Sequence, residues 1–466
     1  MGTNHKGTRP LRVAIIGAGP AGFYTAGQLL NQEEFPLEVD LFDRLPTPYG
    51  LVRGGVAPDH QKIKTVTRIY EKIAKKEGFR FFGNIEFGTD IHLADLRAYY
   101  HQVVFATGAQ TGRLLNIPGS DLPGSHPASD FVAWYNGHPD YRHFNFDLSQ
   151  EKVAVIGMGN VALDVARILC RTPEELAKTD IADYALEALR ESRVKEVYLL
   201  GRRGPAQAAY TPSEIKEIGQ LADVDIIVRP EEAQLDAFSQ IDLDEHQDKV
   251  ALKNIETIKA YARLSPAGKG RRLHFRFLIS PQVLIGEGSG RVQRMRCVRN
   301  RLYQTELGRL QSQPTGQVEE IAVGLVFHSI GYRGVPLPGV PFNLRQWVIE
   351  HQKGRVYDPY QATTLPGLYT AGWIKRGASG VIGSNKKDAI ETVEVMLEDL
   401  AAGRFLHPPK PDRSQVEAML GQRQPRFVVF KDWLHLDQIE VARGAAHNRP
   451  RDKFSVVEEM LTEMEI

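Results

Sequence analysis

The strongest constraint on the fold of this chain is a pattern that occurs twice: a short apolar strand, a glycine-rich turn and a helix. The first copy is the strand Arg12–Ile16 with the turn Gly17–Gly22, and the second is Lys152–Ile156 with Gly157–Ala162. Such β-branched runs are typical of parallel strands buried on both faces. The copies lie too far apart for a solenoid repeat. The pattern therefore predicts an α/β fold with two Rossmann-like, doubly wound dinucleotide-binding domains.

The first turn has the features of a pyrophosphate site. Its glycines let a phosphate approach the backbone, and the helix that follows, expected to reach about Asn31, offers free N–H groups at its N-terminus. The next strand, Leu37–Phe42, ends in Asp43, where such sites place a carboxylate for the adenosine ribose. The alternative is a tight structural turn. Strand, turn, helix and acid in this order favour dinucleotide binding.

A long glycine-punctuated loop, Tyr49–His60, has no place in a minimal βαβ unit. The glycine pattern alone does not separate FAD from NAD. Loops of this length are usually functional, and covering an extended cofactor is one such function. We therefore expect FAD at the first site.

The second turn ends in Ala162, a variant in which alanine replaces the last glycine where helix packs on strand. The strand Glu196–Leu200 leads to Arg202 and Arg203 in place of an acid. A carboxylate there would repel a 2′-phosphate, whereas guanidinium groups bind phosphate bidentately. The pair predicts NADP(H) over NAD(H); the alternative is two solvated surface arginines.

Other stretches give weaker structural predictions. We expect one amphipathic helix from about Pro173 to Ser192, a linker at Asn116–Pro127 and antiparallel strands between about Val250 and Val326. A further helix is expected near Lys386–Leu400. The last part of the chain, which contains Trp433, carries no chemical signal.

Charge and cysteine content exclude several functions. The 58 basic and 57 acidic side chains nearly cancel, so no global charge attracts nucleic acid or an anionic membrane. The two cysteines, Cys170 and Cys297, are far apart, which excludes a CxxC redox pair and a cysteine-ligated zinc or iron–sulfur site. No metal site is expected, and an iron–sulfur carrier must come from outside the chain.

The sequence also predicts where the protein works. No apolar run is long enough to span a bilayer, so we expect no membrane insertion, and Met1–Pro10 lacks the apolar core of a secretory signal. We expect a cytoplasmic protein, or a mitochondrial matrix protein if a transit peptide has been removed.

Four segments give the chain a specific resemblance: Leu51–His60, Gly159–Arg167, Gly201–Pro205 and Gly372–Gly377. Together they resemble the adrenodoxin reductase-like ferredoxin–NADP reductases, over most of the chain. Plant-type reductases, which carry FAD on a β-barrel, do not look like this. The resemblance implies an enzyme that transfers electrons between NADP(H) and a ferredoxin-type iron–sulfur protein through FAD.

The resemblance also implies a glutathione-reductase-like arrangement, with the NADP domain inserted in the FAD domain. The FAD-binding domain then comprises residues 11–112 and 331–466, and the NADP-binding domain residues 113–330. The implied FAD contacts are Gly17, Gly19, Pro20, Ala21, Gly22, Asp43, Leu51, Ile85, Trp373, Gly380, Val381 and Ile382. The implied NADP(H) contacts are Asn160, Val161, Arg202, Arg203 and Glu214, with Gly380 where the two cofactors meet. Asp43 departs from many relatives, which have Glu, but the shorter carboxylate still reaches a ribose.

The loop Gly377–Gly383 fits this implication on physical grounds. It precedes a helix, and a helix N-terminus stabilises negative charge on the N1/O2 edge of a reduced flavin. Trp373 is either a core residue or a contact of the isoalloxazine ring.

His60 and Asp164 are candidate catalytic residues. In the family that the chain resembles, the equivalent residues lie near the nicotinamide and form a hydrogen-bonded pair. Hydride moves from NADPH to flavin N5, and passing electrons on singly requires N5 to lose its proton, which a histidine oriented by a carboxylate can relay. The alternative for His60 is a structural or solvated histidine.

Several arginines crowd one stretch and are candidates for docking an acidic ferredoxin; the alternative is a solvated face. They are Arg291, Arg294, Arg296, Arg299 and Arg301.

Three other functions share some of these features. A disulfide or thioredoxin reductase needs a CxxC pair that the chain lacks. An NADPH-dependent diaphorase, oxidase or monooxygenase would keep both nucleotide sites without a dedicated ferredoxin. A nonenzymatic nucleotide sensor would bind NADPH without reducing a flavin. The sequence leaves the oligomeric state, monomer or weak dimer, open.

Overall fold

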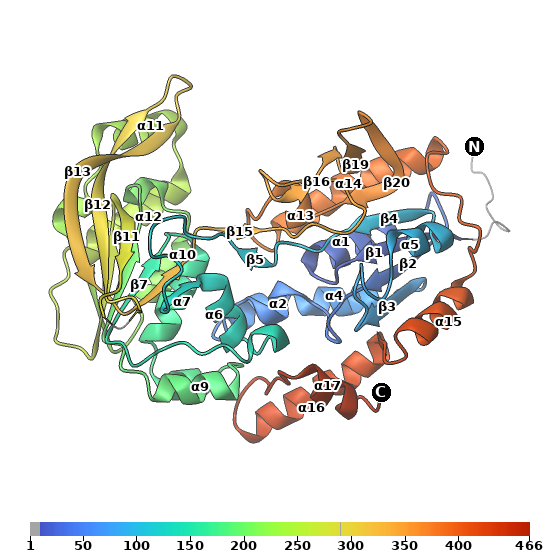
Figure 1. Ribbon diagram of the computed structural model, residues 1–466, viewed down its shortest axis with the longest axis horizontal. Helices are drawn as coiled ribbons and strands as arrows, with labels where there is room; N and C mark the ends of the chain where they lie inside the picture. The colour runs from blue at the N-terminus through green and yellow to red at the C-terminus, as the bar shows by residue number, and fades with distance from the viewer. Residues whose placement is uncertain (1–9, 289) are drawn as a thin grey trace. The chain divides into compact units, whose positions relative to one another are not determined.

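The computed structural model describes residues 10–288 and 290–466, so the expectation for the start of the chain lies almost entirely outside the described residues. The chain forms two compact units (Figure 1). The first runs to Thr111 and includes Asn136–Arg142 and Tyr332–Ile466; the second comprises Gly112–Tyr135 and His143–Gly331. No helix in the described residues is long and apolar enough to cross a membrane.

The assignment of Asn136–Arg142 to the first unit differs from the predicted domain boundaries, which placed this segment in the second domain. It packs in the first unit because Asp140 forms an ion pair with Arg44, and Arg142 Nη1 donates a hydrogen bond to Ser455 Oγ at 2.6 Å. Which cofactor each domain binds stays a prediction.

In the described residues, the first unit is built on an eight-stranded sheet of order β18-β19-β20-β4-β1-β2-β3-β21. Its central strands β20, β4, β1, β2 and β3 are parallel, and the edge strands are antiparallel to their neighbours. The strands are β1 (Leu11–Ile16), β2 (Leu37–Phe42), β3 (Phe79–Gly83), β4 (Gln102–Phe105), β18 (His351–Gln352), β19 (Arg355–Asp358), β20 (Thr363–Thr370) and β21 (Val428–Val429).

Helices cover both faces of this sheet. The helices of this unit are α1 (Pro20–Leu29), α2 (Leu51–Gly54), α3 (Gln61–Lys64), α4 (Thr67–Ala74), α5 (Leu93–Tyr99), α13 (Trp373–Arg376), α14 (Ser384–Ala401), α15 (Arg413–Arg423), α16 (Phe430–Ala446) and α17 (Val457–Glu463), with a 3-10 turn at Pro139–Tyr141. Val13 and Ile15 of β1 pack with α1, α14 and α16, whereas Ala14 and Ile16 pack with α5 and α15. Burial on both faces explains why β1 is apolar apart from Arg12, whose charge is paired with Asp40.

The described residues also form two small sheets, β5 (Thr111–Gly112) with β15 (Tyr332–Arg333), and β16 (Phe342–Asn343) with β17 (Val348–Ile349). The division between the units falls within β5.

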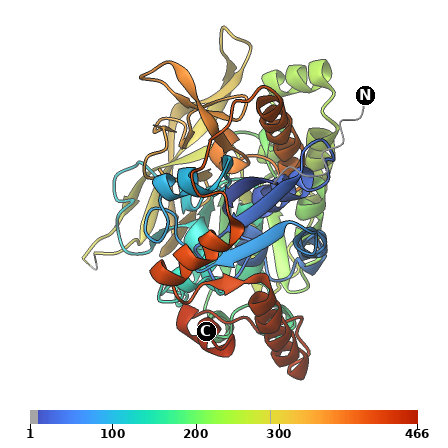
Figure 2. The same ribbon diagram turned by 90° about the vertical axis from the view of Figure 1, so that its right-hand side faces the viewer.

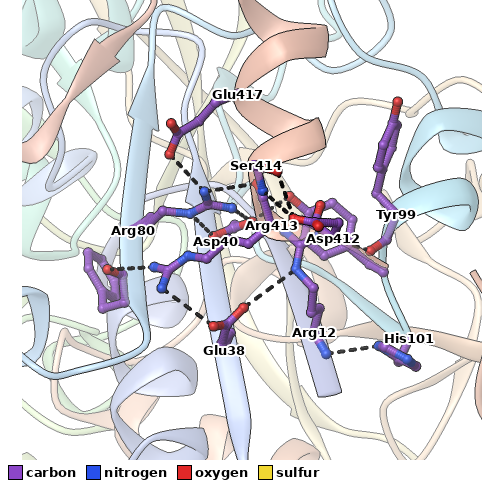
Figure 3. A network of polar contacts seen from close by, with 12 residues as sticks. Arg12, Glu38, Asp40, Arg80, Tyr99, His101, Asp412, Arg413, Ser414 and Glu417 are labelled. Carbon is purple, nitrogen blue, oxygen red and sulfur yellow. Dashed lines mark hydrogen bonds and ion pairs between the residues drawn. The ribbon is translucent and has the colours of Figure 1, made fainter. Parts of the chain in front are cut away.

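The C-terminal part of the chain returns to the N-terminal sheet (Figure 2). Figure 3 shows the polar network that joins them, centred on Asp40 of β2, which is 1% exposed. Its carboxylate pairs with Arg12 of β1 and Arg80 of β3, both at 2.7 Å, and accepts a hydrogen bond from Tyr100 Oη. Arg80 also reaches Glu417 of α15 at 2.8 Å. These pairs connect three strands to a helix more than three hundred residues later in the chain.

In its described residues, the second unit contains a six-stranded sheet of order β6-β14-β7-β8-β10-β9, parallel throughout. Its strands are β6 (Ser125–Pro127), β7 (Lys152–Ile156), β8 (Glu196–Leu200), β9 (Val224–Val228), β10 (Arg271–Arg276) and β14 (Leu325–His328). Its helices are α6 (Ala128–Tyr135), α7 (Asn160–Cys170), α8 (Pro173–Leu176), α9 (Asp183–Arg190), α10 (Pro212–Ile218), α11 (Ala237–His246) and α12 (Lys249–Tyr261), with 3-10 turns at Pro205–Gln207 and Pro230–Ala233. The predicted bounds of β7 and β8 are confirmed.

Between β10 and β14 the described chain forms a three-stranded antiparallel sheet, visible as the yellow arrows of Figure 1. Its strands are β11 (Ile279–Ile285), β12 (Arg294–Gln304) and β13 (Leu310–Ala322).

The prediction of a single helix over Pro173–Ser192 was wrong, because α8 and α9 are separate. Thr179 Oγ1 donates to Leu176 O and accepts from Ile181 N, which competes with helical bonding. The N–H of Ala182 bonds to Tyr135 O in another helix.

The prediction of antiparallel strands from Val250 onward was wrong in two places: its first part forms the helix α12, and β10 is a parallel strand. Asp248 caps α12 by accepting from Val250 N and Ala251 N, and the buried Ala251, Ile255 and Ile258 follow a helical period. β10 joins the parallel sheet. The linker predicted at Asn116–Pro127 is turn-rich but ends in β6.

Candidate functional site

The first glycine turn leaves the start of α1 open to an anion. Gly17 has φ +111°, and a Cβ there would lie 2.5 Å from Ala106 O. A Cβ on Gly22 would lie 2.0 Å from Gly17 O, so helix and turn pack at a distance that only glycine permits. The N-cap is Gly19 and Pro20 occupies the first turn, so no side chain in the described residues caps this helix. Its first N–H groups are therefore free for a phosphate.

Asp43 is fixed beside this turn. Its Oδ2 accepts from Ala18 N at 2.8 Å and its Oδ1 from Leu45 N at 3.0 Å, while Ile85 N donates to Asp43 O at 2.9 Å. Burial raises the pKa of Asp43, and the backbone N–H groups of Leu45 and Ala18 partly oppose that rise. The structure thus brings Asp43 and Ile85 to the phosphate turn.

The loop that begins at Tyr49 also lies against this turn. Tyr49 N donates to Ala18 O at 2.8 Å, and a Cβ on Gly50, which has φ +49°, would lie 3.0 Å from the Cα of Gly19. Leu51, the first residue of α2, is 37% exposed next to this close approach. The exposed leucine is available to pack on a ligand held at the turn.

The C-terminal glycine loop meets the same place from the other end of the chain. A Cβ on Gly372 would lie 2.5 Å from the Cβ of Ala21, in the first turn of α1. Trp373 Nε1 donates to Ser379 O at 3.0 Å and so closes the loop that contains Gly380. Gly380 has φ +79° and is exposed.

The end of this loop combines exposed and buried apolar side chains. Val381 is 56% exposed, and Ile382 packs partly on the core. The helix α14 that follows has Gly383 at its N-cap, and in the described residues no acid lies in its first turn. Both ends of the chain therefore supply predicted FAD contacts around the start of α1.

A buried ion pair fixes α2 within the loop that begins at Tyr49, and sequence reasoning missed this pair. Arg53 of α2 binds the carboxylate of Glu440 through both terminal nitrogens, at 2.7 and 2.5 Å, and Glu440 is fully buried on α16. The guanidinium lies over the ring of Trp433, which packs edge-on against Tyr49. No motif marks Glu440, so only the fold could reveal this pair.

The second glycine turn has the same construction in the second unit. Gly157 has φ +139°, and a Cβ there would lie 2.2 Å from Ser329 O. Gly159 is the N-cap of α7, and a Cβ on it would meet nothing within 4 Å among the described residues. Open space therefore lies before a helix N-terminus, next to Asn160 and the half-buried Val161.

The arginine pair stands beside this turn. A Cβ on Gly201 would lie 2.7 Å from Met158 Cγ, which places the turn Gly201–Arg203 against the glycine turn. In the described chain neither Arg202 nor Arg203 forms an ion pair with a carboxylate; Arg202 is exposed, and Arg203 reaches Gln207 O at 3.5 Å. Burial and the charge of Arg202 lower the pKa of Arg203. Two adjacent cations without an acid fit a doubly charged phosphate.

Asp164 and Glu214 are both held by Arg167, a residue to which sequence reasoning gave no role. Arg167 is fully buried; its Nη2 lies 2.7 Å from Asp164 and its Nη1 lies 3.3 Å from Glu214. Asn160 Oδ1 accepts from Thr211 N, at the N-cap of the helix that carries Glu214. The i,i+3 spacing of Asp164 and Arg167 was the available signal.

His60 lies just before α3 in the first unit, where its carbonyl accepts from Ile63 N at 3.1 Å. Asp164 belongs to the second unit, so their pairing stays a prediction. The two cysteines are free and buried, and burial raises the pKa of both Cys170 and Cys297 to about 12.

The crowded arginines are poor candidates for docking. Most are neutralised by carboxylates: Arg291 by Asp147, Arg294 by Glu287 and Glu320, Arg296 by Glu320, and Arg299 by Glu232, while Arg301 reaches Gln313. The alternative of a solvated, ion-paired face therefore describes them better.

Comparison with known proteins gives one consistent result. Residues 11–220 match the family model described as pyridine nucleotide-disulphide oxidoreductase. The chain is 44% identical to the NADPH-ferredoxin reductase FprA of Mycobacterium tuberculosis, over 97% of this chain and 99% of that protein. It is 40% identical to the mitochondrial NADPH:adrenodoxin oxidoreductase of Arabidopsis thaliana, over 97% of this chain and 95% of that protein. The structure of M. tuberculosis FprA in complex with NADPH superposes with a TM-score of 0.92 at 43% identity, covering 98% of this chain and all of that one.

Proposed function

The chain belongs to the adrenodoxin reductase-like ferredoxin–NADP reductases, and from this membership we propose that it transfers electrons between NADP(H) and a ferredoxin-type iron–sulfur protein through FAD. The first unit binds FAD and the second binds NADP(H). The observation that carries the proposal is the contrast between the two glycine turns, one beside Asp43 and the other beside Arg202 and Arg203.

The residues of the first unit fit FAD. The glycine turn before α1 leaves no room for a Cβ at Gly17 or Gly22, which is the tight turn and close helix packing typical of dinucleotide sites. Asp43 is positioned to accept from ribose hydroxyls. No side chain of the described residues caps the start of α14, and the positive end of the helix dipole there would stabilise negative charge on the flavin.

The residues of the second unit fit NADP(H). The open N-terminus of α7 takes the pyrophosphate, and the two arginines take the 2′-phosphate. The ion pairs of Arg167 fix the positions of two carboxylates beside α7, those of Asp164 and Glu214.

Bound FAD would supply the chemistry that converts a two-electron hydride donor into a source of single electrons, which a nicotinamide cannot supply. The chain's own contribution is to hold both nucleotides and to move a proton. We assign proton relay to His60 and its orientation to Asp164.

Electrons leave the protein through a separate carrier, since Cys170 and Cys297 are buried free thiols and cannot ligate a cluster. Free thiols also fit a reducing compartment, and we place the protein in the cytoplasm, or in the mitochondrial matrix after removal of a transit peptide.

An anaerobic titration tests the proposal. The purified protein, reconstituted with FAD, is mixed with NADPH without oxygen, and the flavin absorbance is followed. We expect one noncovalent FAD per chain and bleaching by NADPH. Failure to hold FAD, or binding of NADPH without bleaching, would refute an electron-transfer role and leave a nucleotide sensor.

A further inference from the structure

The turn that carries the two arginines is held by three successive carbonyl groups. Gly201 O accepts from Ile279 N at 3.0 Å, Arg202 O accepts from Asn300 Nδ2 at 2.9 Å, and Arg203 O accepts from Leu278 N at 3.1 Å. All three donors belong to the antiparallel sheet or to the residue before it. Only one of them is a side chain, that of Asn300.

Asn300 points inward because the alternation of buried and exposed residues along β12 shifts by one position. Met295 and Cys297 are buried at alternate positions, then Val298, Asn300 and Leu302 are buried instead. The register between β12 and β13 shifts at the same point, between Val298 and Asn300. Such irregularities re-aim side chains. Without this shift of phase, Asn300 would face solvent.

Asn300 is fixed in its own position. It is 7% exposed, its N–H donates to Leu278 O at 2.7 Å, and its Nδ2 donates a second hydrogen bond to Ser280 Oγ at 2.7 Å. Both amide hydrogens are used, so the group that holds Arg202 cannot rotate freely.

A neutral donor suits this place. Arg202 and Arg203 repel each other, and no carboxylate in the described chain offsets them. The nearby Arg299 is neutralised by Glu232, whereas this pair must stay charged to attract a phosphate. A carboxylate at position 300 could not donate to a carbonyl and would reduce the local positive charge. An amide orders the turn and leaves its charge intact.

We propose that Asn300 is a positioning residue for coenzyme specificity: its Nδ2 bond to Arg202 O presents Arg202 and Arg203 to the 2′-phosphate of NADP(H). The inference rests on the proposed NADP(H) site. It makes Asn300, 98 residues away from Arg202 along the chain, part of the discrimination between NADP(H) and NAD(H).

Two adenosine ligands test this without the flavin reaction. Calorimetry on the full chain compares adenosine 2′,5′-bisphosphate with adenosine 5′-monophosphate, which lacks the 2′-phosphate. For Asn300→Ala we expect the Kd of the bisphosphate to rise roughly three- to tenfold, as for loss of one neutral hydrogen bond. The Kd of the monophosphate should stay unchanged.

Three further variants sharpen the test. Asn300→Leu fills a similar volume without a hydrogen-bond donor and should behave like Asn300→Ala. It keeps the test valid if Asn300→Ala is unstable because of the cavity it leaves. Tyr184→Phe is the matched control, because it loses a hydrogen bond from a side chain to a backbone carbonyl, that of Trp134, in the same unit. In an Arg202→Ala background, Asn300→Ala should weaken bisphosphate binding less than in the wild type.

The outcomes separate the two claims. If the wild type prefers the bisphosphate and both Asn300 variants keep that preference in full, the inference is wrong and the proposed function stands. If the variants weaken both ligands equally, Asn300 is merely structural and the inference is again wrong. If the wild type itself does not distinguish the ligands, the NADP(H) assignment fails with it.

Discussion

At the level of single residues, Arg202 and Arg203 form no ion pair with a carboxylate in the described chain, unlike Arg296 of the same unit, which pairs with Glu320. Each offers charge-assisted hydrogen bonds of about 1.5–3 kcal/mol to a 2′-phosphate. We expect Arg202→Ala or Arg203→Ala to raise the KM for NADPH roughly ten- to a hundredfold, with kcat largely retained. The KM for NADH should hardly change.

The measurement is the ratio of kcat/KM for NADPH over NADH in both variants. Arg296→Ala is the matched control, since this exposed arginine of the same unit is neutralised by Glu320. Equal losses with both coenzymes would show that the pair is structural.

His60 should affect proton handling more than NADPH affinity. In His60→Gln, which keeps a polar side chain without a titratable ring, we expect a changed pH profile of flavin reduction or reoxidation. The two half-reactions are followed separately by stopped-flow absorbance across pH. Unchanged profiles in both would make His60 a structural residue.

Single residues also show where sequence reasoning ends. Asp43 and the turn glycines follow from local spacing, because strand, turn and helix are contiguous. Asn300 lies about a hundred residues from the turn it holds, and Glu440 lies 387 residues from Arg53. Neither pairing has a local signal, so only the folded chain reveals them.

At the level of elements, α16 and α2 are joined by the buried ion pair of Arg53 and Glu440, to which Arg451 adds a contact at 3.1 Å. Glu440→Gln leaves two cations without their carboxylate, at an expected cost of about 3–5 kcal/mol of folding free energy. α2 begins directly after Gly50, which packs against Gly19 of the first glycine turn. Because losing the ion pair loosens α2, we also expect weaker FAD binding.

Asp40→Asn provides the control, because it disrupts an equally buried pair in the same unit, the network of Figure 3. Thermal unfolding and FAD dissociation are measured for both variants. Both should lower Tm, and only Glu440→Gln should release FAD more readily. If FAD affinity falls equally in both, α16 has no specific link to the loop.

The same pair predicts an acid dependence. Burial would raise the pKa of Glu440, but the charges of Arg53 and Arg451 and a bond from Phe454 N hold it below its ordinary value of 4.5. A lowered pKa in the folded state contributes stability above that ordinary value, which is lost as pH falls through the folded value. Urea unfolding below about pH 4.5 should therefore show a shallower acid loss in Glu440→Gln than in the wild type.

Elements were predictable where one periodicity dominates. β7 and β8 have their expected bounds because apolar runs mark buried parallel strands, and β2 has them although Glu38 and Asp40 interrupt its apolar residues. The prediction of one helix over α8 and α9 failed because Ile181 N bonds to Thr179 Oγ1 and Ala182 N bonds to Tyr135 O, in place of helical hydrogen bonds. α12 was mistaken for strand although its buried residues are spaced as in a helix.

At the level of the whole molecule, the α/β class with two Rossmann-type units was predictable from one pattern that occurs twice, and the comparisons confirm it. What the sequence could not reveal is how the C-terminal segment supports the first unit. Its residues provide Glu417 and Glu440, which bind arginines of the N-terminal region. Their ion pairs join a stretch without motifs to the rest of the first unit.

The central claim, electron transfer from NADPH to a ferredoxin-type protein, is tested most directly by NADPH-driven reduction of cytochrome c with and without such a carrier. We expect fast reduction only with the carrier, and slowing at high salt, because charged docking surfaces are screened beyond about 8 Å at physiological ionic strength. A rate indifferent to both carrier and salt would contradict the claim and identify a simple diaphorase.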